Sequence, residues 1–190
     1  MEKTYQILKL LIWVLVFAVL FAGAYVLYNR LGADSLPQNL ATEPAETEGA
    51  ANMAPDFTVY DAEGGAYRLS DFQGKPVILN FWASWCGPCT GEMPEFQSFY
   101  ETYGEEIHFV LVNLTDGFQE TVESASAYIG GQGYTFPVYY DTDGDAARVY
   151  SVNAIPATYF IGANGGLVAR TQGALTADTL QKGVDMLLEP

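Results

Sequence analysis

The sequence predicts an α/β domain in which helices cover both faces of a sheet. Short apolar runs suited to buried strands alternate with segments of helical character, and the last two predicted strands are joined by a turn containing Asn-Gly. Of the 190 residues, 49% are hydrophobic, which is enough for a packed core and argues against general disorder. This length corresponds to about one domain with additional segments.

The folded part is expected to begin near Ala54 and shows no internal repeat. Its first half contains a predicted hairpin (57–60 and 66–69), a buried strand (76–83), a helix (88–103), a second buried strand (107–114) and another helix (118–129). Its second half contains a strand (136–140), a short helix (146–150), a hairpin (157–161 and 167–171) and a last helix that starts at Thr176.

Residues 10–28 form an uninterrupted apolar run without charge, preceded by two Lys and followed by Arg30. Its length is close to the ~20 residues that a helix needs to cross a membrane. We therefore expect a single-pass transmembrane anchor, with residues 1–9 in the cytoplasm and the folded domain outside. The alternative is a cleaved signal peptide, because the Ala-Gly-Ala at 22–24 resembles a cleavage site.

Residues 29–53 differ in composition from the segments on either side. They contain Pro, Glu, Gly, Ala and Thr and show no apolar periodicity, which indicates a flexible acidic tether. Such a tether would let a domain of residues 54–190 move over the membrane surface.

The charge of the chain is strongly negative, with 8 basic and 23 acidic side chains. From Ala54 onward there are five basic and eighteen acidic residues, a formal charge of −13. Such a surface repels phosphate backbones and anionic lipid, so nucleic acid is not an expected partner.

The two cysteines, Cys86 and Cys89, lie in one tetrapeptide. A disulfide-stapled fold needs several Cys spread along the chain, and a loop this short restrains the unfolded chain little, so their use is chemical. Zinc needs about four ligands, and the one His, His108, lies in an apolar strand. No metal is expected, and no cofactor other than a redox-active Cys86–Cys89 disulfide.

Cys86 is predicted to stand where a strand gives way to a helix. Unpaired N–H groups and the positive end of the helix dipole favour a thiolate there. Gly87 permits a tight approach and Pro88 fits the first helical turn. Cys89, one turn along, is within reach of Cys86. We expect Cys86 to attack a substrate disulfide and Cys89 to resolve the mixed disulfide.

Residues 81–89 (Phe-Trp-Ala-Ser-Trp-Cys-Gly-Pro-Cys) resemble the active site of thioredoxin-fold proteins. Around them, residues 54–57, 69–76 and 133–138 resemble the TlpA/ResA-like branch, whose domain is of the redoxin or AhpC/TSA type. These are membrane-tethered, extracytoplasmic thiol-disulfide oxidoreductases. The resemblance implies a thioredoxin fold with an N-terminal β-hairpin and a central strand–helix insertion at about 115–140, preceded by one transmembrane helix.

The resemblance also implies a substrate-binding surface beside the cysteines. Ile155 and Pro156 match the loop whose cis-proline faces the disulfide, although the sequence alone would favour a trans bond. The backbone of Ile155 would pair with an extended substrate segment. Trp85 would shield Cys86 and contact partners, next to Gly87 and Pro88, whereas Trp82 is expected in the core.

Glu92 matches the acid that follows the motif in this branch, and helical spacing places it on the face of Cys89. It would take or return the proton of the resolving thiol. The alternative is a solvated Glu favoured near a helix N-terminus. Asn80 stands where thioredoxins proper have a buried acid, which agrees with this assignment. Pro94 is expected to kink the helix.

The expected activity is reduction of protein disulfides, because Gly-Pro between the cysteines is the dipeptide of thioredoxin, whose potential is about −270 mV. A potential above about −180 mV would contradict this direction. The resemblance implies a CcdA/DsbD-type membrane thiol donor. It also implies oxidised extracytoplasmic clients such as apocytochrome c. Phe118, Tyr128 and Tyr134 of the insertion are interpreted as packing residues.

Two other functions stay open at this point. One is a peroxiredoxin-like thiol peroxidase, because Ala-Pro-Asp-Phe at 54–57 also occurs at the start of peroxiredoxin domains. Peroxiredoxins have the attacking cysteine in a Thr-x-x-Cys motif, however, and residues 83–86 of this chain are Ala-Ser-Trp-Cys. The other is a tethered binding module without redox activity, which predicts that Cys86→Ser leaves the cellular phenotype unchanged.

Overall fold

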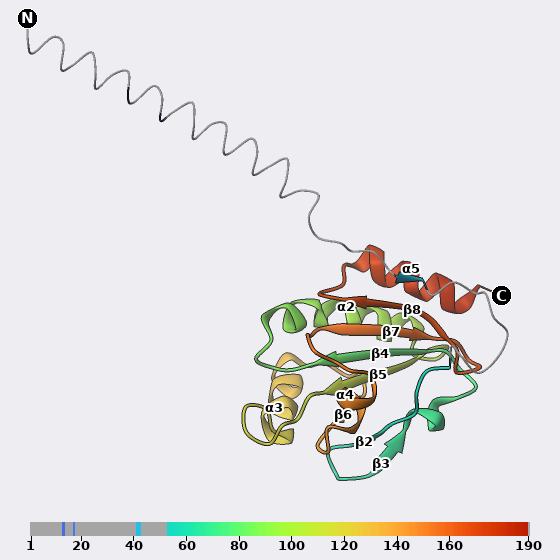
Figure 1. Ribbon diagram of the computed structural model, residues 1–190, viewed down its shortest axis with the longest axis horizontal. Helices are drawn as coiled ribbons and strands as arrows, with labels where there is room; N and C mark the ends of the chain where they lie inside the picture. The colour runs from blue at the N-terminus through green and yellow to red at the C-terminus, as the bar shows by residue number, and fades with distance from the viewer. Residues whose placement is uncertain (1–12, 14–16, 18–40, 43–52, 190) are drawn as a thin grey trace, which may run out of the picture. The chain divides into compact units, whose positions relative to one another are not determined.

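The computed structural model describes Trp13, Phe17, Ala41–Thr42 and residues 53–189 (Figure 1). The chain divides into two units, residues 1–37 and 38–190, and the second contains the sheet. Apart from Trp13 and Phe17, the predicted anchor at 10–28 and its alternative cleavage site lie outside the described residues. Within the described part of the chain, no helix is both long and apolar enough to span a bilayer.

The domain is built on one eight-stranded mixed sheet with the order β1-β8-β7-β4-β5-β6-β2-β3 (Figure 1). The strands are β1 (Ala41–Thr42), β2 (Thr58–Tyr60), β3 (Ala66–Arg68), β4 (Val77–Trp82), β5 (His108–Asn113), β6 (Val138–Tyr140), β7 (Ala157–Ile161) and β8 (Leu167–Gln172). The helices are η2 (Leu69–Phe72), α2 (Gly87–Tyr103), α3 (Val122–Gln132), α4 (Asp145–Val149) and α5 (Ala177–Leu188). Strands β4, β5 and β6 are parallel, and β7 and β8 are antiparallel to their neighbours.

The core lies on both faces of β4, every residue of which is buried. Because side chains alternate along a strand, Ile78 and Trp82 face one apolar cluster and Leu79 and Phe81 face the other. The first cluster receives α2 and α5, and the second receives the N-terminal hairpin and α4. A strand covered on both faces reads as a continuous apolar run, so the predicted α/β arrangement is confirmed.

The register of the sheet brings three connections to one edge. Trp82 at the end of β4 lies opposite Asn113 at the end of β5, so the segments that follow these two strands start side by side. Ala157 at the start of β7 lies opposite Phe81, so the loop before β7 reaches the same edge. Residues far apart in the chain therefore meet just beyond Trp82.

Two segments differ from the sequence expectation. Helix α3 begins at Val122 rather than near Phe118, because Thr121 and Ser124 form a capping box that sets its first turn. Strand β1, which pairs with β8, falls within the range 29–53 predicted as a tether. The rest of that range, except Met53, lies outside the described residues.

Candidate active site at Cys86 and Cys89

The two cysteines form a disulfide at the start of α2, with their Cα atoms 5.2 Å apart. Cys86 is the N-cap residue, and its Sγ accepts the backbone N–H of Cys89 at 3.3 Å. Pro88 stands in the first turn, where its missing N–H leaves no bond unmade. In the reduced protein this N–H and the helix dipole favour the thiolate of Cys86.

The two sulfur atoms differ in accessibility. Cys86 is 6% exposed and Cys89 is fully buried, so an incoming sulfur reaches Cys86 first. Trp85 beside it is 51% exposed, and Gly87 and Pro88 are exposed as well. This order of access fits Cys86 as the nucleophile and Cys89 as the resolving cysteine. Trp82 is fully buried, as the sequence predicts.

The loop before β7 faces the disulfide. The peptide bond between Ile155 and Pro156 is cis, as the family resemblance implies. The Sγ of Cys86 lies 3.8 Å from the carbonyl oxygen of Ile155. The carbonyl of Pro156 accepts the N–H of Gly173 at 2.8 Å, which holds this loop against the end of β8. The backbone of Ile155 is therefore next to the Sγ of Cys86, and its pairing with a client segment stays a prediction.

Glu92 projects from α2 into the interior and is 1% exposed. Its Oε1 accepts a hydrogen bond from Asn80 Nδ2 at 2.9 Å, and its Oε2 accepts the backbone N–H of Leu175 at 2.6 Å. Burial raises the pKa of Glu92 to about 7, although the two hydrogen bonds act in the opposite direction. The interpretation of Glu92 as a solvated residue is therefore wrong, whereas its part in proton transfer stays a prediction.

Asn80 connects this carboxyl group to the sheet. Its Nδ2 also donates to Thr158 Oγ1 at 3.0 Å, so one amide links β4, β7 and α2. The Oδ1 of Asn80 has no hydrogen-bond partner among the described residues. Helix α2 continues through Pro94 to Tyr103.

A second buried carboxylate, Glu120, was not found from the sequence. It is fully buried in front of α3 and accepts hydrogen bonds from Ser84 Oγ at 2.8 Å and Asn113 Nδ2 at 3.1 Å. Asn113, a polar residue at the end of a buried and largely apolar strand, was the one available signal. Glu120 therefore connects the segment after β4 to the segment after β5. Its partner Ser84 lies two residues before Cys86 in the chain.

The aromatic residues of the insertion have different environments. Tyr128 and Tyr134 pack against the core, with ring centroids 6.0 Å apart for Tyr128 and Trp82 and 5.2 Å apart for Tyr134 and Phe136. Phe118 is 95% exposed, so its interpretation as a packing residue is wrong.

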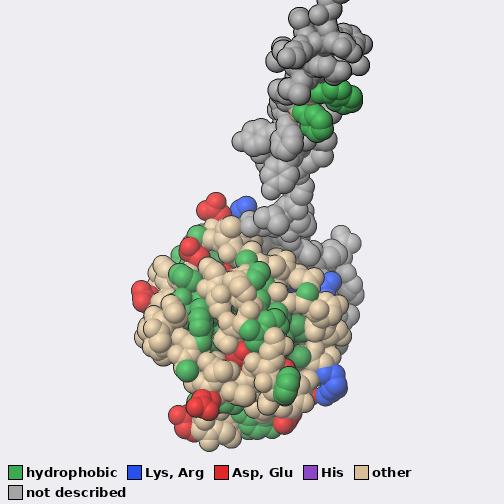
Figure 2. All heavy atoms as spheres, turned by 90° about the vertical axis from the view of Figure 1, so that its left-hand side faces the viewer, with side chains coloured by type: hydrophobic (Ala, Val, Ile, Leu, Met, Phe, Trp, Pro, Cys, Tyr) green, Lys and Arg blue, Asp and Glu red, His purple; other side chains and the backbone are tan. Residues whose placement is uncertain are grey.

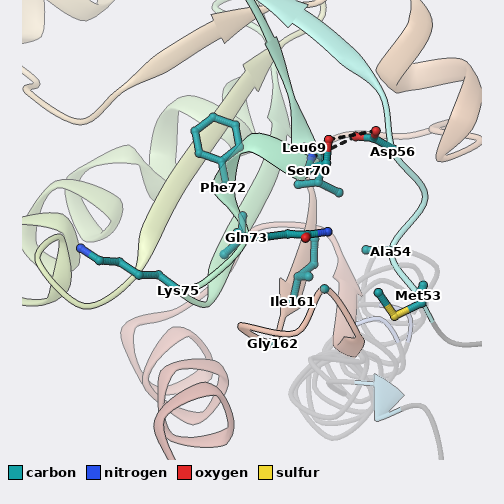
Figure 3. A pocket seen from close by; sticks show the side chains of 12 residues that line it. Met53, Ala54, Asp56, Leu69, Ser70, Phe72, Gln73, Lys75, Ile161 and Gly162 are labelled. Carbon is teal, nitrogen blue, oxygen red and sulfur yellow. Dashed lines mark hydrogen bonds between the residues drawn. The ribbon is translucent and has the colours of Figure 1, made fainter. Parts of the chain in front are cut away.

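No group of three or more metal-ligating side chains occurs among the described residues. His108 contacts the ring of Phe72 edge to face, with centroids 5.4 Å apart. A separate pocket beside Leu69, Phe72 and Ile161 lies at the start of β4 (Figure 3). Since Ile161 pairs with Val77 at that end, this pocket is at the opposite edge of the sheet from the disulfide.

Comparison with known proteins agrees with this geometry. Residues 50–170 match the AhpC/TSA family. Thiol-disulfide oxidoreductase ResA of Oceanobacillus iheyensis is 41% identical over 135 residues, which cover 68% of each chain. The crystal structure of StoA from Bacillus subtilis is 30% identical, with a TM-score of 0.60 over 68% of this chain and 96% of that one.

A third similar protein is the pneumococcal exposed lipoprotein thioredoxin Etrx1 from Streptococcus pneumoniae strain TIGR4. Its crystal structure is 31% identical, with a TM-score of 0.59 over 69% of this chain and 99% of that one. The family match covers more than half of the chain, and the disulfide, the cis-proline and the sheet topology are in place. The chain belongs to the AhpC/TSA family and, within it, to the ResA-like thiol-disulfide oxidoreductases of thioredoxin fold.

Proposed function

We propose that this protein reduces disulfides of client proteins outside the cytoplasm, held at the membrane by residues 10–28. The observation that carries the proposal is the site itself, in which Cys86 caps a helix next to a cis-proline loop and Cys89 lies buried behind it. The apolar run at 10–28 and the similarity to an exposed lipoprotein support the location.

The reaction consists of two exchange steps. The Cys86 thiolate attacks one sulfur of the client disulfide, a bond forms between the two sulfurs, and the other client sulfur leaves as a thiolate. Cys89 then loses its proton and attacks Cys86, which releases the second client thiolate and forms the Cys86–Cys89 disulfide. Two electrons have passed to the client, and the protein is oxidised.

Glu92 is suited to the proton transfer of the second step. Because its pKa lies near 7, both protonation states are populated at neutral pH, so the group accepts a proton and returns it. Helical spacing places it on the same face of α2 as Cys89. In the reverse step, when a donor reduces the disulfide, the same carboxyl group supplies the proton to Cys89.

Turnover requires a source of electrons, since each cycle leaves the cysteines oxidised. We infer a membrane thiol donor of the CcdA/DsbD type, because a domain tethered to the membrane would stay close to a donor embedded in it. Oxidised extracytoplasmic proteins such as apocytochrome c fit as clients. The peroxidase alternative is not favoured, because Ala83 stands where peroxiredoxins have the Thr of their motif and offers no hydroxyl group.

A trapping experiment tests the exchange mechanism. Cys89→Ser removes the resolving thiol, so the mixed disulfide between Cys86 and a client accumulates. With disulfide-bonded insulin as the probe, we expect covalent adducts on non-reducing gels, and dithiothreitol should cleave these adducts by reduction. Mass spectrometry should map the linkage to Cys86.

The matched control is the double variant Cys86→Ser, Cys89→Ser, which should form no adduct. Adducts that persist in the double variant, or their absence from Cys89→Ser, would contradict the proposed function. Retention of the cellular phenotype in Cys86→Ser would favour a redox-independent binding module.

A further inference from the structure

The segment after β5, residues 114–121, presents one aromatic ring to solvent at the active-site edge. Phe118 is 95% exposed, although Phe is among the residue types most often buried in soluble domains. A single exposed apolar residue needs no explanation by itself. The ring of Phe118, however, is held outward by a hydrogen-bonded loop, lies in a loop bonded to the active-site segment and has acidic residues in the loops near it.

The loop is held in one conformation by its own hydrogen bonds. Asp116 Oδ1 accepts the backbone N–H groups of Phe118 at 2.8 Å, of Gln119 at 2.7 Å and of Glu120 at 2.9 Å. These bonds lower the pKa of Asp116. Gly117 donates to the carbonyl of Glu120 at 2.9 Å, with a φ of 73° that favours glycine. The backbone therefore projects Phe118 outward instead of letting it fold onto the core.

The same loop is fastened to the segment that carries Cys86. Buried Glu120 accepts the hydrogen bond from Ser84 Oγ, and Leu114 donates its N–H to the carbonyl of Trp82 at 2.9 Å. Ser84 is next to Trp85, the other exposed aromatic residue of this edge, which is 51% exposed. The loop that carries Phe118 is thus bonded directly to the segment that carries Trp85 and Cys86.

The charges of this edge are of one sign. The loops at this edge include 83–86, 114–121, 141–144, 150–156 and 173–176, and they contain neither Lys nor Arg. Their exposed charged residues are Asp116 and Asp143, whereas Glu120 and Asp141 are buried. Figure 2 faces this edge: hydrophobic side chains gather in its middle, and Lys and Arg lie near its margin. Such a surface attracts basic segments and repels acidic ones.

We propose that Phe118 and Trp85 form a docking surface for an extended client segment that carries an apolar side chain close to its cystine and a net positive charge. The inference rests on the proposed function and adds the class of client that the site selects. Phe118 acts on client binding and not on the exchange chemistry, which takes place at Cys86.

The test compares two synthetic peptides with the same intramolecular disulfide and flanking Lys residues, one with Leu and one with Ser beside the cystine. The reduced full-length protein is mixed with excess peptide, quenched with acid, and the reduced peptide is quantified by chromatography. At subsaturating concentration, we expect the wild type to react about tenfold faster with the Leu peptide than with the Ser peptide. The difference should come from a lower peptide concentration at half-maximal rate, with the maximal rate unchanged.

Three variants locate the preference. Phe118→Ala should abolish it, Phe118→Leu should restore most of it, and Gln119→Ala, an exposed neighbour, should leave it unchanged. Replacing the flanking Lys residues of the Leu peptide by Glu should slow the wild-type reaction, and added salt should reduce that difference. A wild type that reacts equally with the Leu and Ser peptides overturns the inference, as does a preference that survives in Phe118→Ala.

Two further measurements separate the possible failures. Bis(2-hydroxyethyl) disulfide carries neither a bulky apolar side chain nor a charge, so its reduction should not depend on Phe118, and all variants should reduce it at the wild-type rate. A wild type that reduces neither this compound nor any peptide contradicts the proposed function. If it reduces this compound but shows no peptide preference, only the docking inference fails. If sedimentation shows a dimer that Phe118→Ala converts to a monomer, the occupant is a second copy of the chain and the inference is wrong.

Discussion

Glu92 shows how a single residue acquires its properties from its surroundings. The carboxyl group is 1% exposed and receives two hydrogen bonds, from Asn80 and from the backbone of Leu175, but neither donor is a cation. Two neutral donors offset only part of the free energy that the ionised group loses on leaving water, so its pKa rises to about 7. A group with this pKa is suited to proton transfer at neutral pH, but its burial costs stability once it is ionised.

The cost gives a prediction about the pH dependence of folding. The pKa of Glu92 is about 7 in the folded protein and 4.5 in its ordinary state, so the unfolded chain ionises first as pH rises. Stability that is fully present below pH 4.5 is lost as pH rises through 7, by about 3 kcal/mol. Urea unfolding of the oxidised protein at pH 5 and pH 8 should show this loss in the wild type and not in Glu92→Gln.

The matched control is Glu95→Gln, in the same helix but partly exposed, which should keep the wild-type pH dependence. Burial also raises the pKa of Asp141, and that contribution cancels when the variants are compared at the same two pH values. An equal pH dependence of stability in Glu92→Gln and the wild type would show that burial does not raise the pKa of the Glu92 carboxyl group.

Helix α5 shows how closely an element can approach the sheet. Its buried residues Leu180, Val184 and Leu187 recur at helical spacing, which the sequence already indicates. Gly183 lies on the same face, and a Cβ atom placed there would come within 2.0 Å of a ring carbon of Phe160 in β7. The absence of a side chain at this position therefore lets the helix rest directly on the phenyl ring.

Gly183→Ala should lower the free energy of unfolding by about 1–3 kcal/mol, because the added methyl group forces the helix and Phe160 apart. Gly130→Ala is the matched control, since a Cβ atom at this helical glycine in α3 would meet no neighbouring atom within 4 Å. It should raise stability by about 0.5–1 kcal/mol through helix propensity. Denaturant unfolding measures both, and a neutral Gly183→Ala would show that the contact relaxes freely.

The whole domain carries far more negative than positive charge, with eighteen acidic and five basic residues from Ala54 onward. Like charges on one compact body repel one another more strongly than in the expanded unfolded chain. The same excess of negative charge is the basis of the proposed preference for basic clients.

Screening this repulsion should stabilise the folded domain. Raising NaCl from low to near-physiological concentration at pH 7 should increase the midpoint of thermal unfolding by about 3 °C. Choline chloride at equal ionic strength is the control and should act to the same extent, because screening depends on ionic strength alone. A midpoint that falls on addition of either salt would contradict dominance of self-repulsion.

The sequence by itself determined what depends on neighbours along the chain. The buried strands at β4, β5 and β7, the long helix after Cys86 and the last helix from Thr176 are all found close to their expected ranges. Periodicity, caps and turns are local, so they can be read from a few consecutive residues. The pairing of Cys86 with Cys89 follows for the same reason, because the two cysteines are one helical turn apart.

Only the tertiary structure decided which side chains lose contact with water and which keep it. Glu92 meets Leu175 across 83 residues, Glu120 meets Ser84 across 36, and Cys86 meets Ile155 across 69. Phe118 remains exposed because Asp116 closes its loop away from the core. Burial, and with it the pKa of a carboxyl group, depends on strand order and register, which bring together residues that no local pattern connects.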